Sequence, residues 1–106
     1  MKNMFYGVGI NDITDSVKIN GKVIKSYAIW YSMLQRCYDK KLKDKRPTYK
    51  YADCCPEWIY YSKFKKWFNE NYYNIDGEIM HLDKDILVKG NKVYSPETCI
   101  FVPLTI

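Results

Sequence analysis

Two aspartates near the C-terminal end of the chain, Asp83 and Asp85, could bind a cation. Residues two apart on a β-strand share a face, and carboxylate oxygens are the ligands that Mg²⁺ and Ca²⁺ prefer. Lys84 lies between them, so a surface ion-pair cluster is the simpler interpretation of the same three residues. His81 lies three positions before Lys84 and is therefore predicted to point to the opposite face of the strand.

A run of basic residues in the middle of the chain could bind phosphate groups. Residues 39–47 are strongly charged and end in a proline, which interrupts helices, so they are predicted to form an exposed basic loop. Neutralising phosphates releases counterions, so such binding weakens as salt rises. The side chains expected to take part are Lys40, Lys41, Lys43, Lys45 and Arg46, with Arg36 extending the patch from the preceding helix.

The net charge of +5 is concentrated in the first half of the chain. Residues 1–50 contain eleven Lys or Arg and four acidic residues, whereas residues 51–106 contain six and eight. This asymmetry is typical of a surface that binds a polyanion, most commonly nucleic acid, and equally of a solubilising surface.

The cysteines do not predict a metal site or a disulfide framework. Cys54 and Cys55 are adjacent, and no two cysteines have the C-x-x-C spacing of a zinc site. His81 is the single histidine and offers no second imidazole. We therefore expect four reduced thiols, no bound metal and no other cofactor.

The length of 106 residues predicts one domain, 1–106. Aromatic residues make up 17% of the chain, so aromatic rings are expected to supply much of the core. The N-terminus lacks the apolar stretch of a signal peptide, and no run is long enough to cross a bilayer. We expect a cytoplasmic protein that does not contact membranes.

The first 25 residues predict a turn followed by a β-hairpin. Gly7 and Gly9 fall in a turn that extends to Asp12. The Asn20-Gly21 pair, flanked by valines and isoleucines, is a strong hairpin signal and predicts a hairpin over residues 16–25.

Residues 26–72 predict two helices with aromatic faces, joined through the basic loop. Ser26 is the expected N-cap of the first helix, and Pro56 is the expected start of the second, which should end near Tyr72. The first apolar stripe contains Tyr27, Trp30, Tyr31, Leu34, Cys37 and Tyr38, and the second contains Trp58, Tyr61, Phe64, Trp67 and Phe68.

Residues 78–103 return to the short apolar runs of strands. Strands are predicted over residues 79–82, 86–88 and 98–102, with turns at 89–92 and 95–97. Strands and helices thus follow each other in separate blocks, which predicts an α+β fold.

Some tyrosines outside the apolar stripes could stack on the bases of a single strand, although core packing is the stronger interpretation for most of them. These are Tyr49, Tyr51, Tyr60, Tyr72, Tyr73 and Tyr94.

Several short motifs in a fixed order resemble the HNH-like endonucleases common in bacteriophages. Residues 30–38, W-Y-S-M-L-Q-R-C-Y, resemble the W-x-x-M-x-x-R-C helix of that family, and Glu57-Trp58 followed by Phe64 and Trp67 resembles its next helix. Residues 81–103 resemble its closing motif: an Asp-basic-x-Asp strand, an asparagine loop, a Tyr-Ser-Pro-Glu turn, a cysteine and a second strand. The resemblance extends from about residue 7 to residue 102.

The resemblance implies a ββα-metal fold in which a histidine activates water and a divalent metal binds the scissile phosphate. This sequence departs from the pattern, because Lys84 stands where active members have the base histidine, and a protonated lysine cannot accept a proton. The sequence also ends before the helix that would supply the last metal ligand. The residual candidates for a catalytic site are His81, Asp83, Asp85 and Asn91.

Three hypotheses follow from these features. The first is a phage-derived domain with a degenerate HNH-like fold that binds double-stranded DNA through its backbone, without cutting it. Lys84, Lys89 and Lys92 would join its basic surface, because the resemblance places their hairpin against the DNA. The second is a phage counter-defence protein that inhibits a host protein in the host cytoplasm. The third is an active endonuclease that requires Mg²⁺ or another divalent metal.

Overall fold

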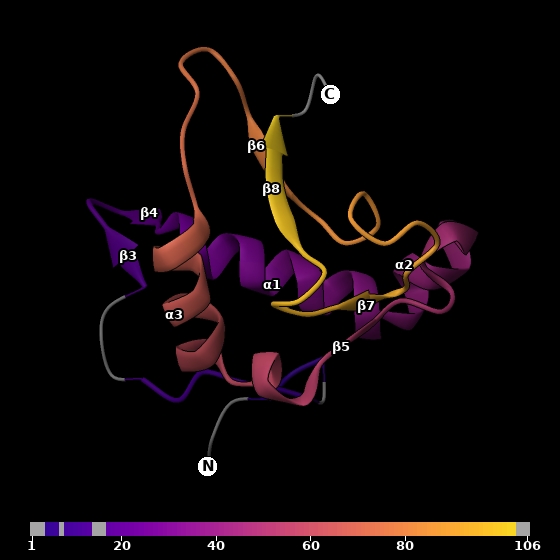
Figure 1. Ribbon diagram of the computed structural model, residues 1–106. Helices are drawn as coiled ribbons and strands as arrows, with labels where there is room; N and C mark the ends of the chain where they lie inside the picture. Colours follow the sequence, from indigo (N-terminus) through magenta and orange to yellow (C-terminus); the bar gives the residue numbers. More distant parts are fainter. Residues whose placement is uncertain (1–3, 7, 14–16, 104–106) are drawn as a thin grey trace.

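Helix α1 (Lys25–Tyr38) runs through the centre of the molecule, and the other elements pack around it (Figure 1). The computed structural model describes residues 4–6, 8–13 and 17–103. Trp30, Leu34 and Cys37 of the predicted stripe are buried, as is Met33, while Tyr31 is partly exposed. The mixture of helices and small two-stranded sheets confirms the predicted α+β class.

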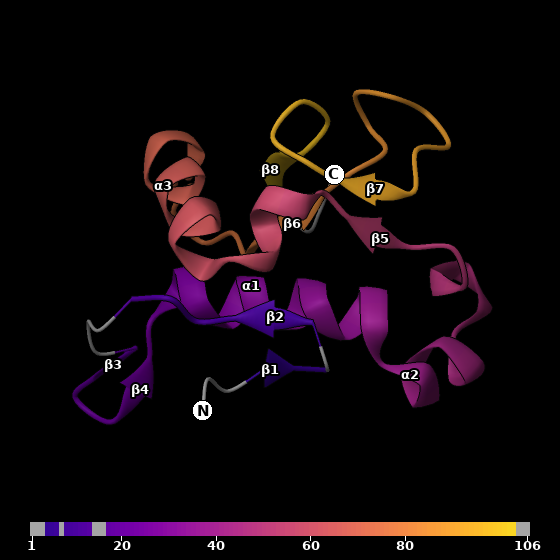
Figure 2. The same cartoon turned by 90° about the horizontal axis from the view of Figure 1, so that it is seen from below.

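The N-terminal segment forms two small hairpins. Strands β1 (Met4–Phe5) and β2 (Gly9–Ile10) pair antiparallel, and the pair lies beside α1, across from α3 (Tyr61–Asn71) (Figure 2). Gly9 is thus in a strand and not in the predicted turn, and Gly7 lies outside the described residues. A side chain on Gly9 would overlap Cδ1 of the buried Leu34, so the glycine allows β2 to approach α1 closely.

The second hairpin confirms the Asn-Gly prediction. Strands β3 (Lys18–Ile19) and β4 (Lys22–Val23) pair antiparallel around Asn20 and Gly21, whose φ angles are 53° and 78°. Positive φ at both positions is the geometry of a type I′ turn, which asparagine and glycine tolerate best. Residue 16 of the predicted hairpin lies outside the described residues.

The predicted helix starts need correction. Ser26 does not cap α1: the helix begins one residue earlier, and Ser26 is buried with its Oγ 2.7 Å from the hydroxyl of Tyr61. Pro56 begins a separate 3₁₀ helix, η2 (Pro56–Ile59), and helix α3 (Tyr61–Asn71) follows it. Asp12 caps α3 from outside, because its carboxylate accepts hydrogen bonds from the backbone N–H and hydroxyl of Ser62.

Aromatic rings join α1, η2, α3 and the C-terminal strands into one core. The Trp30 indole N–H donates to the carbonyl of Trp58 at 2.8 Å. The Trp58 and Phe64 rings lie 4.9 Å apart, and those of Trp67 and Phe101 lie 5.2 Å apart. Within the described part of the chain, no buried side-chain nitrogen or oxygen lacks a hydrogen-bond partner, as burial of tyrosine and tryptophan requires.

The basic segment is not the loop that its composition predicts. Residues 40–45 form a short helix, α2 (Lys40–Lys45), followed by a 3₁₀ turn, η1 (Pro47–Tyr49). Asp39 caps α2 by accepting hydrogen bonds from the backbone N–H groups of Lys41 and Leu42. Aspartate is a favoured N-cap residue, so Asp39 is a signal for the start of a helix. The prediction of a loop rested on the high charge of the segment and did not use this signal.

The C-terminal part contains two separate strand pairs. Strand β6 (Met80–Asp83) pairs antiparallel with β8 (Ile100–Pro103), whereas β7 (Val93–Tyr94) pairs in parallel with β5 (Asp53–Cys54). Residues 86–88 are not a strand, and the last strand begins two residues later than predicted. The predicted turns at 89–92 and 95–97 are confirmed by the Asn91 N–H bond to Val88 O and the Cys99 N–H bond to Ser95 O.

No helix in the described residues is long and apolar enough to cross a bilayer.

Candidate nucleic-acid interface

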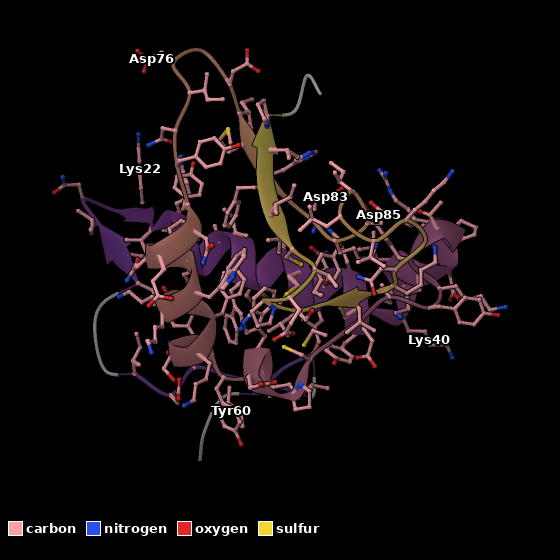
Figure 3. The ribbon with its side chains drawn as sticks, viewed as in Figure 1. Lys22, Lys40, Tyr60, Asp76, Asp83 and Asp85 are labelled. Atoms are coloured by element: carbon pink, nitrogen blue, oxygen red, sulfur yellow. The ribbon has the colours of Figure 1, made fainter. Side chains whose placement is uncertain are left out.

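A cavity of about 400 Å³ brings together six of the residues that the sequence singles out. They come from α1, β6 and the loop 84–92, and they are Arg36, His81, Asp83, Lys84, Asp85 and Lys92. Thr48 and Tyr49 of η1 also line it, so the cavity adjoins the basic helix α2. Figure 3 shows Asp83 and Asp85 toward the end of the molecule that carries α2, with Lys22 toward the other end.

Strand β6 places His81 and Asp83 on one face. Met80 and Leu82 are buried in the core, whereas His81 and Asp83 are half-buried, as the alternation of a strand requires. The strand ends at Asp83, so Asp83 and Asp85 do not share a strand face as predicted. Lys84 follows the strand, so the alternation that would separate it from His81 does not extend to it, and both residues line the cavity.

The end of β6 is fixed by the Asp83 carboxylate. Its Oδ2 accepts hydrogen bonds from the backbone N–H groups of Asp85 at 3.0 Å and Ile86 at 2.7 Å. These bonds turn the chain after the strand, at the point where Lys84 and Asp85 line the cavity. Asp83 therefore has a structural role in the loop as well as a place in the cavity wall.

Asn91 organises the other end of the same loop. Its Nδ2 donates to the carbonyl of Lys84 at 2.8 Å, the carbonyl of Val93 at 2.7 Å and Thr98 Oγ1 at 3.3 Å. Its side-chain amide is engaged by the loop itself and is not among the groups that line the cavity. The structure thus separates Asn91 from His81, Asp83 and Asp85.

Arg36 and Lys84 meet at a single tyrosine ring. Arg36 Nη1 donates to the hydroxyl of Tyr94 at 3.2 Å, and the Arg36 Cζ lies 5.9 Å from the ring centroid. Lys84 Nζ lies 5.4 Å from the same centroid. Tyr94 is 3% exposed, and burial raises its pKa although the Arg36 guanidinium opposes the shift, so the phenol is neutral at neutral pH.

The cations of α2 differ in their accessibility. Lys43 folds back, with Nζ donating to the carbonyls of Lys50 at 3.2 Å and Ala52 at 3.0 Å. Its ammonium thereby connects α2 to the segment that follows. The sequence predicts an exposed Lys43, whereas the side chain is half-buried. The other predicted cations of this segment and of loop 84–92 are exposed: Lys40, Lys41, Lys45, Arg46, Lys89 and Lys92.

The loop 84–92 also exposes three consecutive apolar side chains. Ile86, Leu87 and Val88 are 50%, 56% and 49% exposed. The sequence predicts a partly buried strand here, but no neighbouring strand pairs with this segment in the described part of the chain.

The thiols are buried and the described residues contain no preformed metal cluster. All four cysteines are free, and burial raises the pKa of Cys54 to about 11 and that of Cys99 to about 12. Within residues 4–6, 8–13 and 17–103, no three or more His, Cys, Asp or Glu side chains are placed to hold one metal ion. His81, Asp83 and Asp85 share a cavity without forming such a group.

Sequence reasoning did not assign Thr48 to the site, and it assigned Tyr49 and Tyr94 to the core or to base stacking. No local pattern marks them, because η1, β7 and α1 are brought together only by the tertiary fold. Comparison with family models, with curated proteins and with solved structures finds no match to this chain.

Proposed function

We propose that this protein binds double-stranded DNA through its phosphate backbone. The observation that supports the proposal is the cavity lined by Arg36 of α1 and by Lys84 and Lys92 from the two ends of the loop 84–92, next to the exposed lysines of α2. Among the charged residues of the lining, Arg36, Lys84 and Lys92 outnumber Asp83 and Asp85. Together with the exposed lysines of α2, they favour a site for a polyanion.

The binding mode that fits this surface is contact with phosphates. The basic side chains belong to the short helix α2, the loop 84–92 and the half-buried Arg36 of α1. This arrangement suits contact with a sugar-phosphate backbone. We infer little sequence preference, because α1 and α3 direct their largest side chains into the core. In the terms of the family resemblance, this is a degenerate HNH-like fold used for binding.

Variants of the cavity lysines and arginines test the proposal. Fluorescence anisotropy with a duplex of mixed sequence gives the affinity over a range of salt concentrations. Arg36→Gln and Lys84→Gln should each weaken binding and reduce the slope of log K against log salt by about 1, because each removes one phosphate contact.

Lys22→Gln is the matched control, because Lys22 is an exposed lysine on β4 at the other end of the molecule (Figure 3). It should leave the slope unchanged. Equal slopes for all three variants would contradict the assignment of the cavity, and the absence of binding at low salt would contradict the proposed function itself.

A metal-dependent nuclease is the second candidate, and the shared position of His81, Asp83 and Asp85 in one cavity favours it. Histidine and carboxylate side chains are the groups that water activation near a phosphate needs. The test incubates the protein with supercoiled plasmid and Mg²⁺, Mn²⁺, Ni²⁺ or Zn²⁺. Nicking that is lost in His81→Ala and Asp83→Ala would establish the nuclease, and intact plasmid under all four metals would reject it.

A further inference from the structure

We propose that Arg36 and Lys84 form a two-cation clamp for one phosphate group, and that Tyr94 is the residue that positions both. The inference rests on the proposed DNA binding and adds to it the place where a phosphate is held. Arg36 belongs to α1, Lys84 to the loop after β6, and Tyr94 to β7, so the clamp exists only in the folded chain.

Tyr94 is itself held rigidly. It is buried, its backbone carbonyl accepts a hydrogen bond from the Cys55 N–H at 2.8 Å, and β7 pairs in parallel with β5. A buried ring on a paired strand has little freedom to move, so the positions of its hydroxyl and its face are fixed. Arg36 and Lys84 therefore both contact a side chain whose position is fixed.

Each cation contacts the tyrosine in a different way. The Arg36 guanidinium donates a hydrogen bond to the hydroxyl, and the Lys84 ammonium lies 5.4 Å from the ring centroid, within the range of a cation–π interaction. The hydroxyl thus acts on Arg36 alone, whereas the ring lies near both cations, because Arg36 Cζ is 5.9 Å from its centroid. A single side chain orients both charges, and the hydroxyl contact can be removed while the ring is kept.

Two cations near one ring are mutually repulsive, which makes an anion between them favourable. An arginine that is already held in one rotamer loses less conformational entropy when it binds a phosphate. Asp83 and Asp85 also line the cavity. The Asp83 Oδ2 accepts hydrogen bonds from two backbone N–H groups of the turn, and the Asp85 side chain is exposed to solvent. The ligand that matches this arrangement is a phosphate oxygen pair.

The phosphate could be internal to a DNA strand or at its end, and two duplexes distinguish these sources. One duplex is closed by hairpin loops and offers only internal phosphodiesters, and the other has open ends with 5′-phosphates. Binding of the closed duplex that depends on Tyr94 identifies an internal phosphate. Dependence on Tyr94 with the open duplex alone identifies a terminal phosphate, and either result supports the clamp.

The decisive variants remove the hydroxyl in two backgrounds. Tyr94→Phe keeps the ring and should weaken binding about threefold to tenfold, as expected for one charge-assisted hydrogen bond that orients a ligand group. In an Arg36→Gln background the same change should have no further effect, because the hydroxyl acts through Arg36. A purely structural role would lower affinity equally in both backgrounds.

Tyr73→Phe is the matched control. It also removes a tyrosine hydroxyl from a hydrogen bond, in this case to the carbonyl of Phe101, and Tyr73 does not line the cavity. This control should bind DNA like the unmodified chain, and thermal unfolding should show that both Phe variants fold.

Two results separate failure of the clamp from failure of the proposed function. If the unmodified chain binds DNA but Tyr94→Phe binds equally well, or weakens binding by the same factor with and without Arg36, the clamp is wrong and DNA binding stands. If the unmodified chain binds neither duplex at low salt, both are wrong.

Discussion

Replacing Asn91 with aspartate tests whether this asparagine has a structural role or is a remnant of a catalytic site. Aspartate has the same shape but no N–H donor, so the bonds from Nδ2 to the carbonyls of Lys84 and Val93 are lost. A carboxylate oxygen would then face two carbonyl oxygens. If Asn91 were instead a metal ligand, aspartate would bind the cation at least as well.

The expected loss of stability follows from the geometry. A net hydrogen bond contributes about 1 kcal/mol, and two of the three bonds donated by Asn91 are shorter than 3.0 Å. Loss of these two bonds should cost about 2 kcal/mol, and repulsion at the carbonyls should add about 1 kcal/mol more. For a domain of this size, 2–3 kcal/mol corresponds to a fall in Tm of roughly 10 to 20 °C.

Thermal unfolding followed by circular dichroism measures this change. Asn74→Asp is the matched control, because Asn74 is exposed and its Oδ1 only accepts a bond from the Tyr72 hydroxyl, which a carboxylate preserves. The control should change Tm by less than about 3 °C, as is usual for a surface substitution. A stable Asn91→Asp variant that gains metal-dependent stabilisation would refute the structural role.

Three further predictions concern the scaffold. Gly9→Ala should destabilise the fold by about 1–3 kcal/mol in denaturant unfolding, because the new methyl group overlaps Leu34; unchanged stability would contradict the close approach of β2 to α1. Asp12→Ala should cost about 1 kcal/mol, through loss of the cap on α3. Partial burial alone would raise the pKa of Asp12, but the hydrogen bonds from Ser62 lower it below 3.8. The stability that the Asp12 carboxylate contributes is therefore present at neutral pH and is lost as the pH falls below about 4. A stability difference between wild type and Asp12→Ala that persists in acid would contradict the assignment. The four buried thiols should resist a chromogenic disulfide reagent at neutral pH until denaturant is added, because burial raises their pKa values; rapid labelling of the native protein would contradict their burial.

The elements that the sequence predicts well are those specified by neighbouring residues. The β3–β4 hairpin follows from Asn20-Gly21, whose backbone preferences select the turn without help from the rest of the chain. The buried faces of α1 and α3 follow from helical spacing of large apolar residues. In both cases the information is local.

The errors have two physical causes, a local side-chain turn and a tertiary contact. Residues 86–88 have the composition of a strand, but the Asp83 and Asn91 side chains shape this segment into a loop. Serine is a residue type that favours N-cap positions, but Ser26 lies within α1, where its hydroxyl forms a hydrogen bond with the buried Tyr61. Asp83 lies three residues before Ile86, so its turn is a local signal that the apolar pattern did not include. Tyr61 lies 35 positions after Ser26, and periodicity carries no signal of that contact.

The candidate site shows the same division. The sequence identifies most of the charged groups that line the cavity, because their types and density are visible in the chain. It does not identify Tyr94 as their common contact, since Arg36 and Tyr94 are 58 positions apart. It also treats Lys43 as accessible, whereas the carbonyls of Lys50 and Ala52 bind its ammonium.

The salt dependence of duplex binding by the unmodified protein tests the central claim most directly. If Arg36, Lys84 and Lys92 each contact a phosphate, log K should fall linearly with log salt with a slope of about −3, and steeper if the α2 lysines take part. A duplex of scrambled sequence should give nearly the same slope. No detectable binding at low salt, or an affinity that does not change with salt, would contradict a backbone-directed DNA-binding protein.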